Sequence, residues 1–290
     1  MSDPTIAQSA EVDLLEVWDI IKRYRWVVSG IAASAACIAI AFVLVAKPQW
    51  EATAVLQVGQ VGQYGQVGQS GRLIEPVART VERMNMKTFA SAVLTTLKIP
   101  LEENDPVGGL YRGTLKVRPV PNTDLVEIGV RAHSPEEASL WADTTVKTLS
   151  AFHEQIAAPS KAVLTQQLED IKRDIATVKA AQQTLRQRAE SATLSAANLF
   201  SQNMLLATMI QQRDNELRGL ENQKLVFEEQ LSPLRTYPTS LLAPASVTDR
   251  PVWPKKKLTV VLASLGGLLV GVIAAFLLNA KHSRSLHSRS

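Results

Sequence analysis

The residues that could support chemistry are few and scattered along this sequence of 290 residues. Of its four histidines, His133 and His153 flank a predicted helix, and the other two lie close to the C-terminus. The histidines, the one cysteine and the acidic residues nowhere show the spacing of a metal site, and no Gly-x-Ser-x-Gly nucleophile motif occurs. The acid pairs at 102–103 and 136–137 are better explained as solvated turns and helix caps. We therefore expect no catalytic, cofactor-binding or metal-binding residues, and the protein is predicted not to be an enzyme.

The stretch VGQVGQYGQVGQSG, residues 58–71, has a glycine at every third position and raises a second question about chemistry. A collagen strand needs many such triplets with frequent proline, and this stretch has five glycines and no proline. A phosphate-binding loop of the Walker type would end in Gly-Lys-Ser/Thr, whereas this run ends in Ser70, Gly71 and Arg72. The pattern indicates a mobile connection between a strand and a helix, long enough to serve as a contact surface.

Two windows of the sequence contain no charged residue, at 26–46 and 258–280. A helix rises about 1.5 Å per residue, so each window is long enough to cross a hydrocarbon core of roughly 30 Å. A cleaved signal peptide is the alternative for the first window, but the window is too long for a signal peptide and follows several acidic residues. The sequence therefore predicts two transmembrane helices, one near each end.

The charges beside the two windows predict the orientation. Lys22, Arg23 and Arg25 precede the first window and Lys47 alone follows it closely, so the N-terminus is expected in the cytoplasm. Two crossings return the C-terminus to the same side. The triplet of lysines at 255–257 lies on the outer side and conflicts with this rule. We expect the first window to dominate, because long loops cross a membrane largely regardless of their charge.

The net charge argues against nucleic-acid binding, whereas the cysteine content says little about the class of protein. The net charge of +4 arises from interspersed acidic and basic residues, which is not the footprint of a nucleic-acid-binding protein. Cys37, the only cysteine, lies in the first window, so no disulfide can form within one chain.

Between the two windows, the first part of the sequence predicts a small α/β layer. Residues 51–58, 113–120 and 124–132 have strand patterns, and residues 75–97 have apolar positions at helical spacing. A second helix is predicted to begin at Ser134, with Glu137 completing a capping box. The order of strand, helix, two strands and helix is typical of a small sheet covered by helices.

From Ser160 onward the apolar residues alternate between spacings of three and four up to Leu234, as in a coiled coil. Because the chain must return to the membrane, we expect a helical hairpin that turns near residues 190–203; one long helix is the alternative. Residues 191–212 carry no charge, which indicates either packing within the hairpin or contact between neighbouring copies. The residues expected at such an oligomer contact are Leu199, Phe200, Leu206, Met209 and Ile210.

Both apolar windows carry small residues at every fourth position, a spacing that lets helix backbones approach closely. We expect these faces to pack together or against other copies. The expected transmembrane packing residues are Ser29, Ala33, Cys37 and Ala41 in the first window, and Ala263, Gly267, Gly271 and Ala275 in the second.

Three stretches carry a resemblance to a known family. They are EVDLLEVWDIIKRYRWVV before the first window, WEATAVLQVGQ after it, and the proline-rich APASVTDRPVWPKKK before the second, with Pro244, Pro251 and Pro254. With the order of the predicted elements, they resemble the Wzz-like chain-length determinant, or polysaccharide co-polymerase, family of inner-membrane proteins.

The resemblance implies a non-catalytic regulator of polysaccharide chain length in a bacterial inner membrane, acting on O-antigen, capsule or exopolysaccharide. It implies a ring of identical subunits that works with a membrane polymerase and the growing polysaccharide. Neither a P-loop nor a tyrosine cluster follows the second window, so we expect no fused tyrosine kinase, whereas a separate cytoplasmic kinase remains compatible. The alternative function is that of an export protein bridging the inner membrane to an outer-membrane channel.

The expected fold is an α+β membrane protein, in which two transmembrane helices flank a periplasmic α/β base domain with a long helical hairpin. The expected domains are a cytoplasmic N-terminus (1–25), transmembrane helix 1 (26–46), the base domain (47–158, with a Gly/Gln-rich loop at 58–71), a helical hairpin or long helix (159–235), a proline-rich return segment (236–257), transmembrane helix 2 (258–280) and a cytoplasmic tail (281–290).

Overall fold

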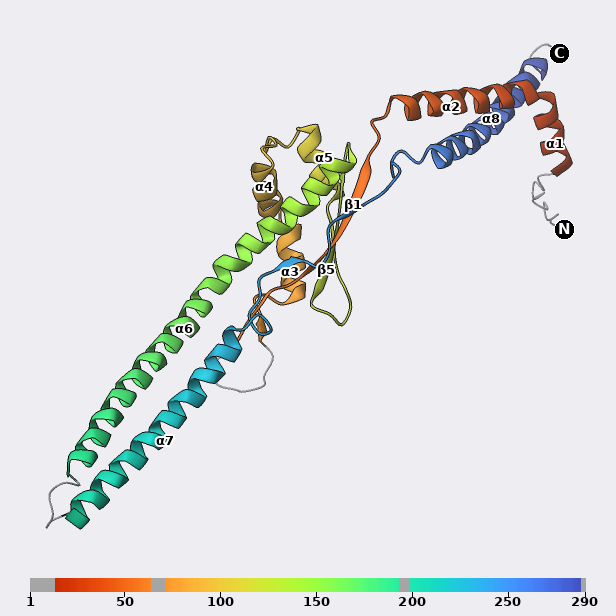
Figure 1. Ribbon diagram of the computed structural model, residues 1–290. Helices are drawn as coiled ribbons and strands as arrows, with labels where there is room; N and C mark the ends of the chain where they lie inside the picture. The colour runs from red at the N-terminus through yellow and green to blue at the C-terminus, as the bar shows by residue number, and fades with distance from the viewer. Residues whose placement is uncertain (1–13, 64–70, 193–198, 288–290) are drawn as a thin grey trace, which may run out of the picture. The chain divides into compact units, whose positions relative to one another are not determined.

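The computed structural model describes residues 14–63, 71–192 and 199–287, and the chain divides into two compact units (Figure 1). One unit, here the membrane unit, consists of residues 1–50 and 248–290; the other, here the base unit, consists of residues 51–247.

The membrane unit consists of α1 (Leu14–Arg23), α2 (Arg25–Val45) and α8 (Lys256–His287). The segments Arg25–Val45 and Lys256–Asn279 are long and apolar enough to cross a membrane, and little of either is buried within the protein. They pack against each other in opposite directions, since Gly267 lies against Ala35 and Gly271 lies against Val28. An apolar helix pair that leaves most of its surface open is typical of membrane spans.

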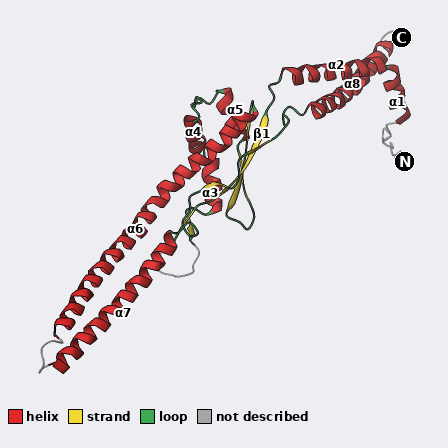
Figure 2. Cartoon of the chain, in the orientation of Figure 1, coloured by secondary structure: helices red, strands yellow, loops and turns green. Residues whose placement is uncertain are grey.

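The base unit is built on a small sheet with the strand order β4-β5-β1-β6, in which the short strand β7 also pairs with β1. The strands are β1 (Trp50–Gln57), β4 (Lys116–Pro119), β5 (Leu125–Ala132), β6 (Ser240–Leu241) and β7 (Ser246–Val247). Burial alternates along β1, and β5 buries Val126, Ile128, Val130 and Ala132, as the predicted half-buried strand requires. Figure 2 shows the strands gathered beside the N-terminal part of α6.

The single helix predicted over residues 75–97 is wrong, because the chain forms two helices there. α3 (Val77–Asn85) and α4 (Lys87–Thr96) are separated at Met86, whose backbone is extended (φ −71°, ψ 142°). The apolar periodicity continues across the break because each half has its own partner: α3 packs on β4 and α4 packs on α6. The change of direction leaves Met84 and Phe89 both buried.

A further short helix, α5 (Pro106–Thr114), was not predicted from the sequence. Asp105 caps it by accepting a hydrogen bond from Gly108 N at 2.6 Å, and Pro106 occupies its first turn. Its buried Tyr111 contacts Trp141 edge-on and pairs its hydroxyl with Thr145 at 2.9 Å. This contact joins α5 to α6 in the centre of the base unit.

The helix α6 (Pro135–Ala192) is 58 residues long and has both predicted capping residues at its start, although the Glu137 side chain bonds to His133 N rather than to Ser134 N. Ser134 Oγ accepts from Glu137 N at 3.1 Å, and Glu137 Oε2 accepts from His133 N at 3.2 Å. The sequence placed a boundary at residue 159, between a base helix and a projecting arm. In the structure, α6 continues through Pro159, so one helix serves both the base and the arm.

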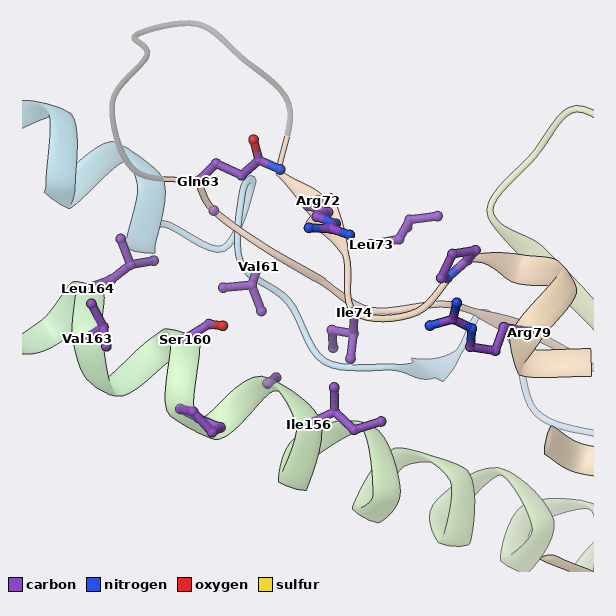
Figure 3. Close-up of a pocket in the computed structure, with 14 residues that line it drawn as sticks. Val61, Gln63, Arg72, Leu73, Ile74, Arg79, Ile156, Ser160, Val163 and Leu164 are labelled. Atoms are coloured by element: carbon purple, nitrogen blue, oxygen red, sulfur yellow. The ribbon is translucent and has the colours of Figure 1, made fainter.

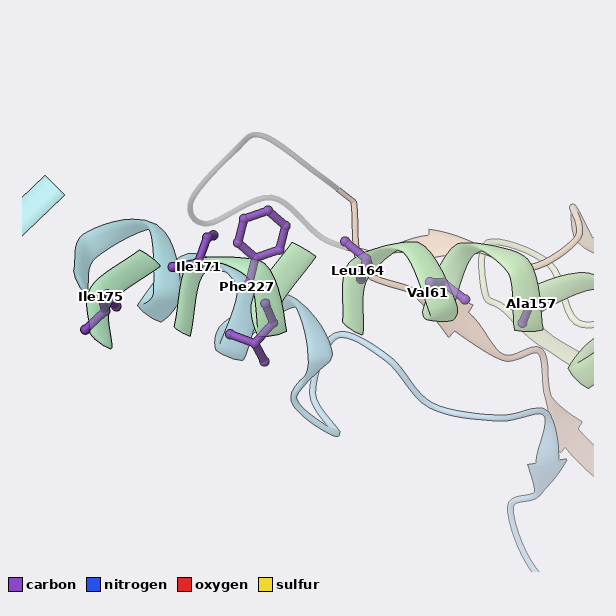
Figure 4. Close-up of a cluster of buried hydrophobic side chains, with 7 residues drawn as sticks. Val61, Ala157, Leu164, Ile171, Ile175 and Phe227 are labelled. Carbon is purple, nitrogen blue, oxygen red and sulfur yellow. The ribbon is translucent and has the colours of Figure 1, made fainter. Parts of the chain in front are cut away.

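The second arm, α7 (Leu199–Leu231), packs against α6 to form the hairpin, while the turn residues 193–198 lie outside the described residues. Figure 4 shows part of the apolar seam between the arms, in which Phe227 of α7 lies near Ile171 of α6. Charged pairs flank the seam further out, Lys179 with Glu221 at 3.0 Å and Arg186 with Asp214 at 3.6 Å. The expected fold class, two candidate spans with an α/β base and a helical hairpin, is confirmed.

Candidate functional site at the junction of base and hairpin

The glycine-rich stretch forms two short paired strands rather than a free connection. β2 (Gln60–Val61) and β3 (Arg72–Leu73) pair antiparallel, with Gln60 opposite Leu73 and Val61 opposite Arg72. The predicted mobile connection is therefore wrong for both ends of the stretch, and its middle, residues 64–70, lies outside the described residues.

The first end of this stretch is bound to the segment that follows α7. We call residues 59–63 and 230–239 together the return junction. Hydrogen bonds from backbone N–H groups connect the two segments over much of their length. They are Gly59 N to Thr239 Oγ1 (2.8 Å), Gln60 N to Tyr237 O and Tyr237 N to Gln60 O (both 3.0 Å), Gly62 N to Thr236 Oγ1 (2.9 Å) and Gln63 N to Gln230 Oε1 (3.1 Å).

The glycines are required because the two segments approach too closely for side chains. A Cβ atom on Gly62 would lie 2.3 Å from the carbonyl oxygen of Gln230, and one on Gly59 would lie 2.5 Å from Thr239 N. A Cβ on Gly71 would lie 2.4 Å from the carbonyl oxygen of Arg235. Close approach of one backbone to another is thus the physical reason for glycine at these three positions.

A buried polar network extends from the return junction into the base. Thr239 Oγ1, which accepts from Gly59 N, lies 2.5 Å from His153 Nδ1, and His153 Nε2 lies 3.4 Å from Glu75 Oε2. Arg83 donates two hydrogen bonds to the Glu75 carboxylate, at 2.8 and 3.0 Å. Thr239, His153 and Glu75 are all at most 3% exposed, so the network links α6, α3 and the return segment away from water.

The environment of this network determines its protonation. Burial is the largest influence on His153 and holds its pKa below the ordinary value, although the Glu75 carboxylate opposes this. Burial alone would raise the pKa of Glu75, but hydrogen bonds and charge from Arg83, with a smaller contribution from His153, lower it overall. A neutral His153 that donates from Nε2 to the Glu75 carboxylate leaves Nδ1 to accept the Thr239 hydroxyl proton. Every member of the chain is then satisfied.

A cleft of about 750 Å³ lies beside the return junction, between residues 61–79 and the part of α6 around Pro159 (Figure 3). In Figure 3, Arg72 and Arg79 are on the side of β3 and α3, and Ile156 and Ser160 are on the side of α6. Its lining includes apolar residues and a smaller polar set, Gln63, Arg72, Arg79 and Ser160. No acidic side chain is among the described residues that line it.

The side chains that line the cleft offer groups that can bind a ligand. Within the described part of the chain, Arg72 and Arg79 form no ion pair, so two guanidinium groups are free to bind carboxylate or hydroxyl groups. Nowhere in residues 14–63, 71–192 and 199–287 do three or more His, Cys, Asp or Glu side chains gather in a way that would hold a metal ion. The arrangement fits recognition of an extended polar ligand.

Sequence reasoning missed this site because its parts are far apart in the chain. His153 lies 78 residues from Glu75 and 86 residues from Thr239, and no local spacing relates the three. The regular glycines were the one available signal, and their role in close approach becomes visible only once the return segment is placed.

The expected packing face of the second span lies against the first. Gly267 and Gly271 face α2: a Cβ on Gly267 would lie 2.7 Å from Ala35 Cβ, and one on Gly271 would lie 3.0 Å from Val28 Cα. Ala275 is buried and Ala263 is half-buried on the same helix.

The expected packing face of the first span is not the one that contacts α8. Ser29, Ala33, Cys37 and Ala41 are all exposed in the described structure. The contact uses the neighbouring face instead, in which Ala35 lies against Gly267 and Val28 lies against Gly271.

The three prolines expected to form the family motif are divided between the two units. Pro244 is exposed between β6 and β7 in the base unit. Pro251 and Pro254 lie in the membrane unit, where both line a second pocket and Pro254 is buried after a cis peptide bond.

The residues expected at an oligomer contact lie at the start of α7. Leu199 and Phe200 are the first residues of α7, and their side chains lie outside the described part of the structure. Leu206 and Ile210 are half-buried, whereas Met209 is exposed, as are the neighbouring Met204 and Leu205.

Comparisons with known proteins give one family match. The family model described as "Chain length determinant protein" (Wzz) matches residues 10–97. No curated protein matches the chain.

Several solved structures are similar to it. A full-length bacterial polysaccharide co-polymerase shares 18% identity, with a TM-score of 0.44, covering 93% of this chain and 99% of that chain. A point mutant of a Shigella flexneri lipopolysaccharide O-antigen chain-length regulator shares 14% identity, with a TM-score of 0.30, covering 70% and 99%. A fragment of a Salmonella Typhimurium polysaccharide co-polymerase shares 12% identity, with a TM-score of 0.29, covering 71% and 100%.

The matched residues 10–97 comprise the first candidate span, β1, the β2–β3 pair and the helices α3 and α4. On this match, this part of the chain is similar to the chain length determinant proteins of the Wzz family.

Proposed function

We propose that this protein regulates the length of a polysaccharide, such as O-antigen, capsule or exopolysaccharide, together with a membrane polymerase. The observation that carries the proposal is the chain length determinant match over residues 10–97. The family is one of regulators and not of catalysts, so the polymerase performs the chemistry. In this proposal the protein spans the bacterial inner membrane twice, with both termini in the cytoplasm and the base unit in the periplasm. A separate tyrosine kinase, in an organism that has one, would meet the cytoplasmic segments.

The cleft beside the return junction supports a direct role in contacting the growing polysaccharide. A polysaccharide presents rows of hydroxyl groups and, in acidic polymers, carboxylates. Gln63 and Ser160 supply neutral hydrogen-bonding groups, and Arg72 and Arg79 supply fork-shaped donors without acidic neighbours in the lining. In the proposal, these side chains hold the polymer transiently, close to where the hairpin leaves the base.

Exposed apolar and small residues support assembly of several copies into a ring. Ser29, Ala33 and Cys37 leave a small-residue face of α2 open, and Met204 and Leu205 are 64% and 63% exposed on α7. Within a closed ring, both surfaces would face neighbouring copies. Many weak contacts of this kind give a scaffold of fixed size that can be presented to the polymerase.

The experiment that tests the proposal is deletion of the gene in its host, followed by gel electrophoresis of the surface polysaccharide. Loss of the preferred polymer length, with polymer still made and restored by the wild-type gene, is the expected result. Accumulation of polymer that fails to reach the surface would support an export role instead. An unchanged length distribution in a strain without a second copy of the gene would refute the proposal.

A further inference from the structure

A second pocket, of about 730 Å³, lies within the membrane unit where α2 ends and α8 begins. Its walls come from residues 43–48 at the end of α2 and residues 250–258, which lead into α8. Directly after the first segment, Gln49 forms backbone hydrogen bonds with the second, from Gln49 N to Trp253 O at 3.0 Å and from Val252 N to Gln49 O at 2.8 Å. The pocket therefore has a defined frame at the ends of both candidate spans.

The interior of the pocket is apolar and open toward the surroundings of the helices. Trp253 lies edge-on to Phe42, with ring centroids 6.1 Å apart, and it is 36% exposed. Leu44 and Leu258 are 77% and 51% exposed, whereas Val43 is buried. A tryptophan at the end of a span is typical of the membrane–water interface, where its ring meets both acyl chains and headgroups. The apolar lining thus continues the surface that the spans present to acyl chains.

The polar part of the lining is entirely basic. Arg250, Lys255, Lys256 and Lys257 line the pocket, and no acidic residue is among the described lining residues. Within the described part of the chain, none of these four forms an ion pair. The first turn of α8 also lacks an acidic residue, and its backbone N–H groups add to the positive potential.

The lysine triplet is the feature that conflicts with the orientation expected from charge. Lysines that disfavour the expected orientation, and that pair with no acidic group among the described residues, require another explanation. A ligand with an anionic head and an apolar tail satisfies both halves of the lining at once. Such ligands form the membrane itself, and an anionic bilayer surface attracts basic residues placed within a few ångströms of it.

We propose that this pocket binds one acidic phospholipid of the leaflet in which α2 ends and α8 begins. An acyl chain lies against Val43, Leu44 and Trp253, and the phosphate lies among the lysines and the N-terminal amides of α8. The inference goes beyond the proposed function, because it depends on neither a polysaccharide nor a polymerase. It assigns the lysines at 255–257 the role of anchoring the start of α8 to lipid headgroups.

The test is native mass spectrometry of the full chain in detergent micelles, titrated with phosphatidylglycerol or phosphatidylcholine. The pocket variant combines Lys255→Gln, Lys256→Gln and Lys257→Gln. The matched control combines Lys22→Gln, Arg23→Gln and Arg25→Gln, which removes the same charge from the opposite end of α2. A third variant, Trp253→Ala, opens the apolar wall while all the basic residues remain. Thermal unfolding of each variant verifies that it is folded.

We expect the wild-type chain to bind one phosphatidylglycerol at least about tenfold more tightly than phosphatidylcholine, since each basic residue near an anionic surface contributes roughly fivefold. The pocket variant should lose this preference, the control variant should keep it, and Trp253→Ala should weaken both lipids. Equal losses in the pocket and control variants would show general surface attraction and overturn the proposal. Competition by free glycerol phosphate at the same concentration as the lipid would also overturn it, because a plain anion site needs no acyl chain.

Discussion

The return junction makes a sharp prediction for the variant Gly62→Ala. The backbone of Gly62 does not require a positive φ, so an alanine tests the close approach of the two segments alone. Its Cβ would lie 2.3 Å from the carbonyl oxygen of Gln230, and the segments must separate by about 1 Å to reach an ordinary contact distance. Overpacking of this kind costs about 1–3 kcal/mol. The same movement weakens the hydrogen bonds of Gly62 N and Gln63 N, worth about 1 kcal/mol each.

The expected destabilisation by Gly62→Ala is therefore about 2–4 kcal/mol. In a unit of this size, that corresponds to a melting temperature lower by on the order of 10 °C. The assay is thermal unfolding of the full chain in detergent, followed by tryptophan fluorescence, in which Trp141 reports on the core of the base unit. Trypsin cleavage after Arg235, which is half-buried in the return junction, gives a local readout and should become faster.

Gly219→Ala is the matched control, because its Cβ would meet nothing within 4 Å on the exposed side of α7. Alanine is favoured over glycine in a helix, so this variant should be more stable by about 0.5–1 kcal/mol. The two variants make the same chemical change, but one is expected to lower the stability of the protein and the other to raise it. A Gly62→Ala protein with the melting temperature and the Arg235 cleavage rate of the wild type would refute the close-approach argument.

Three further predictions test other parts of the structure. Gly267→Ile should separate α2 from α8 and lower the melting temperature in detergent, whereas Gly266→Ile should be tolerated because its Cβ would meet nothing within 4 Å. Equal melting temperatures for the two variants would contradict the helix packing. Phe227→Ala removes a ring that is 6% exposed in the hairpin seam and should cost about 3 kcal/mol in thermal unfolding, against less than about 0.5 kcal/mol for Leu225→Ala at 61% exposure. Burial holds the pKa of His153 below its ordinary 6.5, so the unfolded chain binds a proton at this residue more readily than the folded protein does. The free energy of unfolding should therefore be highest above about pH 6.5 and should fall as the pH drops below that value. The free energy of unfolding, measured between about pH 7.5 and about pH 5.5, should show this dependence on pH. If a His153→Gln variant had the same dependence, His153 would not be its cause.

The features that the sequence predicted correctly are those with a local physical signature. Two uncharged windows were sufficient for the candidate spans. The spacing of apolar residues predicted long helices, and the need to return to the second window favoured a hairpin over one long helix. Ser134 and Glu137 specified the start of α6 because both capping groups lie within one turn. In each case the residues that interact are neighbours in the sequence or repeat with one period.

The features that the sequence did not predict depend on distant partners or on a change of direction. The break at Met86 is hidden because the apolar period continues while the packing partner changes. The strands β6 and β7 are two residues each and exist only because β1 offers an edge. The face of α2 that contacts α8 could not be chosen from spacing, since two adjacent faces both carry small residues. The candidate site combines segments from four parts of the chain.

The continuity of α6 has a mechanical consequence. At about 1.5 Å per residue its 58 residues form a rod of roughly 87 Å, anchored in the base core at one end and paired with α7 at the other. The chain returns from the hairpin at the return junction, where Val61 shares a buried cluster with Ala157 of the same rod. Pro159 lacks an N–H and therefore leaves one hydrogen bond of the helix unmade, which makes this turn the most compliant point of the rod. A lateral force on the hairpin will bend α6 there first, and because Pro159 lines the cleft, bending changes the width of the cleft.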